Sequence, residues 1–291
     1  MARLSAMTKM VGLVVGLAML GCSLQVARVG ADFVPLYVFG GRFVDSGNNN
    51  YLDTTVKADA PPYGIDSPTG RPTGRFSNNR NIPDFISQAL KLPEPPTPYL
   101  SPQLTGERLL YGCNFASAGA AILNDTGLRL RNIITIPKQL QAFPQYKNKL
   151  AAQVGGREQA ERLVNKGVFL LSIVSDDFVN NYYSPPFSSR ASQYTIFEFI
   201  ELLISELSKI LLRLNELGAR RLLVFGSGGF GCWPALLAIR GSTDGGEYVF
   251  WDSTNPTDKA EGLFVEGILS GPADVVFPIN LNTMLAMEHE A

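Results

Sequence analysis

The chain has 291 residues, of which 45% are hydrophobic and 18% are charged. A chain of this length and composition can bury a full core, so the sequence predicts one globular domain and excludes a disordered or fibrous protein. The 25 Lys and Arg side chains nearly balance the 26 Asp and Glu side chains. No basic run could neutralise a series of phosphates, which excludes nucleic acid as a partner.

The first 31 residues have the pattern of a secretory signal peptide. Arg3 and Lys9 give a positive start, residues 10–24 are apolar, and small residues at 29–31 offer a cleavage site. The apolar run is shorter than the ~20 residues that span a bilayer, which argues against a transmembrane anchor. We therefore predict a signal peptide over residues 1–31, a mature domain over residues 32–291, and secretion.

The first predicted strand covers residues 35–39, a short apolar run that ends at two glycines. Residues 53–83 are dense in Pro, Gly, Asn and Asp and predict an irregular loop. A helix is predicted over residues 82–90, because Asn81 can cap it and Pro83 fits its first turn.

The second half of the chain alternates strands and helices. Continuous apolar runs predict buried strands over residues 168–174 and 221–225, and apolar residues at helical spacing predict a helix over residues 194–217 that stops at Gly218. A last helix is predicted over residues 257–269. This alternation predicts a parallel sheet between helices, with the functional residues at the carboxyl ends of its strands.

Four separated segments resemble the sequence blocks of the plant GDSL esterase/lipase family, also called SGNH hydrolases. The first is Phe-Gly-Gly-Arg-Phe-Val-Asp-Ser-Gly-Asn-Asn-Asn-Tyr-Leu at residues 39–52, where the family has Phe-Gly-Asp-Ser-Leu and an Asp-x-Gly-Asn-Asn-Asn-Tyr-Leu tail. The others are Asn-Phe-Ala-Ser-Ala-Gly-Ala at 114–120, Val-Ser-Asp-Asp-Phe-Val-Asn-Asn-Tyr at 174–182, and Phe-Trp-Asp-Ser-Thr-Asn-Pro-Thr at 250–257. Their order and spacing agree with the family along most of the chain.

The resemblance implies a flavodoxin-like three-layer α/β/α sandwich with a mostly parallel sheet. In the family a long stretch with a helix and a further strand precedes the last block, whereas here only residues 235–248 join Pro234 to Val249. We therefore expect an internal deletion near residues 235–249 and the loss of one strand and one helix.

The family's chemistry needs a serine nucleophile, a histidine base three residues after an aspartate, and an oxyanion hole that includes a glycine amide and an asparagine side chain. The resemblance places Arg42 at the nucleophile position, Asn255 at the histidine position and Asp176 at the oxyanion asparagine. Only Gly119 and Asp252 match. Because neither guanidinium nor amide can attack an ester or take a proton, we predict impaired or absent hydrolysis. The family implies neither a cofactor nor a metal.

Other residues do not replace the missing groups. Ser46 aligns with the variable tail and is interpreted as a turn residue that bonds its own backbone, and His289, the only histidine, lies close to the C-terminus. Asn124 begins a glycosylation sequon, which predicts a surface loop. Cys113 and Cys232 could form a disulfide after export or remain two buried thiols.

Three hypotheses therefore remain: a secreted ester hydrolase, a pseudoenzyme that binds an acyl ester, lipid or glycan in the family's cleft, and a non-functional truncated gene product. A guanidinium in a partly desolvated cleft is costly unless it is paired. We accordingly expect Arg42 to form an ion pair with Asp176 or Asp252, the alternative being a side chain that extends to solvent.

Overall fold

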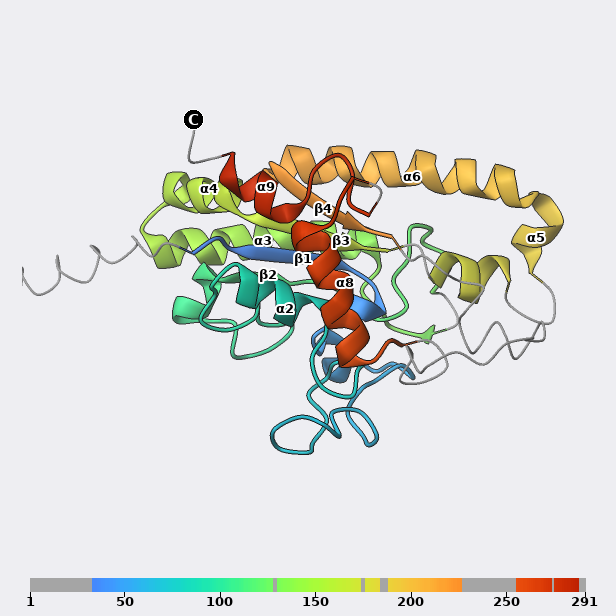
Figure 1. The fold of residues 1–291 in the computed structure, drawn as a ribbon, viewed down its shortest axis with the longest axis horizontal. Helices are drawn as coiled ribbons and strands as arrows, with labels where there is room; N and C mark the ends of the chain where they lie inside the picture. The colour runs from blue at the N-terminus through green and yellow to red at the C-terminus, as the bar shows by residue number, and fades with distance from the viewer. Residues whose placement is uncertain are drawn as a thin grey trace, which may run out of the picture.

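A parallel sheet, with four strands in the described part of the chain, organises the fold (Figure 1). The computed structural model describes residues 33–127, 130–173, 176–183, 188–226, 255–273 and 275–287. Within them the strand order is β2-β1-β3-β4. The strands are β1 (Leu36–Gly40), β2 (Gly112–Asn114), β3 (Val168–Ser172) and β4 (Arg221–Phe225).

The strand register brings three loops to one edge of the sheet. Gly40 at the end of β1 pairs with Ser172 of β3, which pairs with Phe225 of β4. Since these strands are parallel and end at the same level, the chain segments that follow β1 and β3 leave the sheet side by side. This is the edge where ligands bind in open parallel sheets.

Strand residues alternate between two cores because successive side chains point to opposite faces. Tyr37 and Phe39 of β1 lie in one hydrophobic cluster, while Leu36 and Val38 lie in the other. The first cluster is completed by α3 (Ile136–Val154), α4 (Arg157–Lys166) and α6 (Ile196–Leu217), and the second by α2 (Ile82–Ala89), α8 (Asp258–Ser270) and α9 (Leu281–Ala286). Two helical layers thus enclose the sheet (Figure 1), which confirms the three-layer prediction.

Most of the elements predicted from sequence are confirmed. Strand β4 and the start of α2 lie where expected, with Asn81 at the N-cap of α2. Helix α6 begins after Thr195, whose hydroxyl accepts the Glu198 amide, and ends at Gly218 with φ of 114°, a conformation that glycine adopts without steric cost. Residues 53–81 carry neither strand nor α-helix, as the predicted irregular loop requires.

The prediction that the helix at residues 257–269 is the last element of the chain is wrong. Helix α9 follows α8 after a segment that contains Pro278. A six-residue helix is too short to give a clear periodic pattern, and its packing against the second core stabilises it instead.

Shorter helical segments lie between the larger elements in the described residues. They are η2 (Arg42–Val44), η3 (Asn48–Tyr51), η4 (Gly106–Leu110), α5 (Ser189–Gln193) and the π-helical η6 (Asp177–Tyr182). Among the described residues, no helix is both long and apolar enough to span a bilayer.

Candidate functional site

Arg42 lies at the carboxyl edge of the sheet, where three segments meet. It begins η2 directly after Gly41, which follows β1. A Cβ atom added to Gly41 would lie 2.7 Å from the Ala120 carbonyl oxygen and 3.3 Å from Oδ2 of Asp176. The turn after β1, the loop that carries Gly119 and the loop after β3 therefore pack closely around this point.

Arg42 and Asp176 form an ion pair. Nη2 of Arg42 lies 3.6 Å from Oδ1 of Asp176, and the two side chains are 18% and 6% exposed. The pairing predicted from sequence is thus confirmed for Asp176, while the alternative partner Asp252 lies outside the described residues. The geometry corresponds to a charge contact in a largely buried site, because 3.6 Å exceeds the usual hydrogen-bond distance.

Asp176 has a second polar neighbour and a shifted acidity. Asn180 donates its side-chain amide to the same Oδ1 oxygen. Burial raises the pKa of Asp176 above its usual value, whereas the charge of Arg42 and the hydrogen bond from Asn180 act in the opposite direction. Arg42 thus stabilises a carboxylate that the protein interior disfavours.

The remaining predicted residues are placed as follows. Gly119 has φ of +91° and lies in the loop beside Gly41. Asn255 is 1% exposed and lies two residues before the Thr257 N-cap of α8. Asp252, Cys232 and His289 lie outside the described residues, so the Asp252–Asn255 relation is not tested. Cys113 is a buried free thiol, which agrees with the alternative of unpaired thiols rather than with a disulfide.

Ser46 has a structural environment rather than a catalytic one. It is 4% exposed, and its hydroxyl oxygen accepts the Asn114 side-chain amide at 2.9 Å. The interpretation that Ser46 bonds its own backbone is wrong, because its neighbour Asp45 does so instead: one Asp45 oxygen accepts the amides of Gly47 and Asn48, each at 2.8 Å.

Two buried aspartates that sequence reasoning did not single out fix the loops around the site. Besides its own turn, Asp45 accepts the amide of Ala118 at 3.0 Å and so joins the first and second sequence blocks. Asp177 accepts the amides of Ile122 and Leu123 at 2.8 and 3.1 Å, and the Thr126 hydroxyl at 2.7 Å. For Asp45, the Asp-x-Gly-Asn pattern at residues 45–48 indicates a turn closed by the aspartate side chain. The sequence contains no comparable pattern for Asp177.

We expect these aspartates to make the protein less stable as pH rises from 5 to 8. Burial raises the pKa of Asp45 to about 6 and of Asp177 to about 7, despite their hydrogen bonds. Between the unfolded pKa near 4 and these values the folded state binds more protons, so the free energy of unfolding falls with pH. The expected loss is on the order of 4 kcal/mol, from about one pKa unit of titration for Asp45 and about two for Asp177 above pH 5 at about 1.4 kcal/mol per unit. Urea unfolding curves provide the measurement.

An Asp177→Asn variant provides the control for this pH dependence. It should be destabilised at every pH, because an amide cannot accept all three hydrogen bonds, but its stability should fall less between pH 5 and 8. The Asp59→Asn substitution at an exposed position should keep the original slope. A stability that rises over this range would contradict the assignment.

Comparison with known proteins gives consistent matches. A family model described as GDSL-like lipase/acylhydrolase matches residues 36–262. GDSL esterase/lipase At5g18430 of Arabidopsis thaliana is 40% identical over 334 residues, which cover 86% of this chain and 92% of the relative. GDSL esterase/lipase LTL1 of the same plant is 56% identical over 202 residues, which cover 69% of this chain and 55% of the relative.

Proposed function

Because this chain belongs to the GDSL-like lipase/acylhydrolase family, we propose that it keeps the family's cleft but does not hydrolyse carboxylic esters. One observation carries this proposal: the Arg42–Asp176 ion pair at the carboxyl edge of the sheet. According to the sequence blocks, an active relative would have its serine nucleophile at the position of Arg42 and its oxyanion asparagine at the position of Asp176.

Each of these side chains opposes acyl transfer. A guanidinium carries a permanent charge and no acceptor for a proton, so Arg42 cannot form an acyl intermediate. The carboxylate of Asp176 would repel a developing oxyanion, where an amide would donate a hydrogen bond. Asn255, at the predicted base position, cannot take a proton near neutral pH.

An internal deletion near residues 235–249 is part of the proposal. The alignment with At5g18430 runs over 334 residues, more than the 291 of this chain, although it takes in only 86% of the chain. The relative therefore has residues without a counterpart here. This agrees with the short join between Pro234 and Val249, which lies outside the described residues.

Secretion and ligand class follow from the same family context. We place a signal peptide at residues 1–31, and Asn124 is exposed, as a glycosylated asparagine must be. The ligand that suits the inherited cleft is an acyl ester, a lipid or a glycan. A chain that binds one of these without turnover would be a pseudoenzyme.

A fluorophosphonate probe tests whether any serine is activated. We expect the purified chain to show a cooperative thermal transition and no labelling, because labelling needs a serine deprotonated by a neighbouring base. An active family esterase serves as the positive control, and heat-unfolded protein as the background. Labelling of the folded chain that disappears in a Ser46→Ala variant would contradict the proposal.

A further inference from the structure

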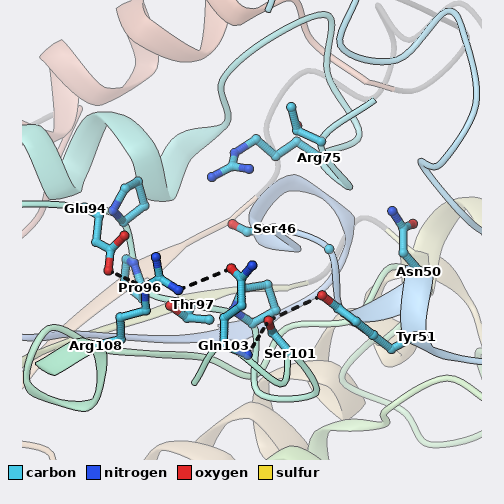
Figure 2. Close-up of a pocket in the computed structure, with 14 residues that line it drawn as sticks. Ser46, Asn50, Tyr51, Arg75, Glu94, Pro96, Thr97, Ser101, Gln103 and Arg108 are labelled. Atoms are coloured by element: carbon cyan, nitrogen blue, oxygen red, sulfur yellow. Dashed lines mark hydrogen bonds and ion pairs between the residues drawn. The ribbon is translucent and has the colours of Figure 1, made fainter. Parts of the chain in front are cut away.

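A polar cavity of about 300 Å³ lies among the loops that follow β1 and α2 (Figure 2). Three loop segments line it: residues 46–51 after β1, residues 73–75 and residues 94–108. None of Arg42, Gly119, Asp176 and Asn255 contributes to its lining. Its volume is at the low end of the range of small-molecule sites.

Each guanidinium in the cavity wall is paired with a carboxylate. Nε of Arg108 donates to Glu94, also in the wall, at 2.7 Å. Arg75 donates to both oxygens of Asp84, which lies behind the wall, at 2.6 and 2.7 Å. The wall therefore favours neither an anion nor a cation through net charge. Each guanidinium has five N–H groups, so N–H groups remain for a ligand beyond those used in these pairs.

An aromatic ring and rigid apolar residues complete the lining. Tyr51 is 52% exposed, and its hydroxyl donates to Oγ of Ser101 at 3.3 Å, which holds the ring at the rim of the cavity (Figure 2). Oε1 of Gln103 accepts Nη1 of Arg108 at 3.3 Å, which leaves the two amide N–H groups of Gln103 available. Pro95, Pro96 and Pro98 add apolar surface without conformational freedom.

We propose that this cavity binds one or two units of a neutral carbohydrate chain. A sugar ring has apolar C–H faces that stack on an aromatic ring, and hydroxyl groups that both donate and accept hydrogen bonds. A wall of paired guanidinium and carboxylate groups, an amide and an exposed tyrosine matches both features. A lipid chain would displace water from the remaining N–H groups of the wall without replacing its hydrogen bonds, at a cost in free energy. The proposal does not depend on whether the cleft hydrolyses esters.

Isothermal titration calorimetry of the full secreted chain tests the site. The probes are cellohexaose, xylohexaose and mannohexaose as neutral chains, and hexagalacturonate as an anionic chain. We expect at least one neutral chain to bind and hexagalacturonate to bind more weakly. A Tyr51→Ala variant should raise the Kd about tenfold or more, as loss of a stacked ring does, while Tyr51→Phe should keep most of the affinity.

Two further variants separate binding from folding. Gln103→Ala should also weaken binding, so it supplies an independent test if Tyr51→Ala lowers the thermal midpoint. Phe197→Ala removes another exposed aromatic ring, 77% exposed at the start of α6 and outside the cavity, and should leave the Kd unchanged. Absence of binding by all three neutral chains, binding of hexagalacturonate alone, or an unchanged Kd in both cavity variants would each overturn the proposal.

Discussion

The purified chain is expected to hydrolyse short-chain p-nitrophenyl esters no faster than its heat-unfolded control. In serine hydrolases, loss of the nucleophile or the base alone lowers kcat about a millionfold, and loss of one oxyanion donor lowers it about a hundredfold or more. These losses are not additive, but the first is sufficient. Initial rates followed by release of p-nitrophenol, with an active family esterase alongside, provide the measurement.

A Ser46→Ala variant identifies the source of any residual rate. Ser46 is buried and hydrogen-bonded by Asn114, so its loss should change no rate above background. Turnover that disappears in this variant would show that Ser46 acts as a nucleophile and would refute the proposed function.

The triple variant Arg42→Ser, Asp176→Asn, Asn255→His distinguishes missing side chains from a damaged fold. Activity requires the new histidine to reach the cleft beside residue 42. If the variant hydrolyses esters, the shortened join near residues 235–249 does not prevent this approach. If it folds with an unchanged thermal midpoint and remains inactive, the deletion itself removes part of the site.

Gly40→Ala is expected to prevent the first strand from pairing normally with the third. A Cβ atom at Gly40 would lie 1.9 Å from the backbone oxygen of Ser172, and Gly40 has φ of +130°. The contacted atoms belong to the backbone of Ser172, so rotation of a side chain cannot relieve the clash. We expect a loss of at least about 4 kcal/mol in the free energy of unfolding, or insoluble protein, since large losses arise from such strain.

Gly106→Ala is the matched control. Gly106 also has a positive φ, of +60°, but no atom lies within 4 Å of the added Cβ. The variant should lose only about 1 kcal/mol, the cost of a left-handed conformation for a residue with a side chain. Urea unfolding of both variants measures the difference, and similar losses at the two positions would show that the contact with Ser172 is unimportant.

Prediction of the fold from sequence succeeded where a pattern was long or strongly apolar. The helix ending at Gly218 and the strand at residues 221–225 lie as expected. No prediction was made for β2, which has only three residues, or for α3, whose sequence contains Pro144 within the helix. In these elements tertiary packing outweighs local signals: Phe143 and Tyr146 of α3 are fully buried against the sheet.

For the site, the sequence blocks identified the positions that correspond to the family's catalytic residues. The charge of Arg42 predicted one contact of that site, an ion pair with an aspartate. A buried guanidinium needs a partner, so a pair of Arg42 with Asp176 or Asp252 could be expected from the sequence, and the structure shows the pair with Asp176. The long-range contacts of Asp45 and Asp177 could not be expected, because their donors include backbone amides 73 and 55 residues away along the chain. Every residue except proline has a backbone amide, so the amino-acid sequence does not show which distant amide bonds to an aspartate. Only the fold identifies these donors.

The loops around the Arg42–Asp176 pair are held by carboxylates rather than by regular secondary structure. The amides of Gly47, Asn48 and Ala118 bond to Asp45, and those of Ile122 and Leu123 bond to Asp177. Exchange of these amide protons with solvent requires a buried carboxyl group to lose its partners, which is costly. We therefore expect these loop segments to open only together with the core, and their bonded amides to exchange as slowly as those of the strands.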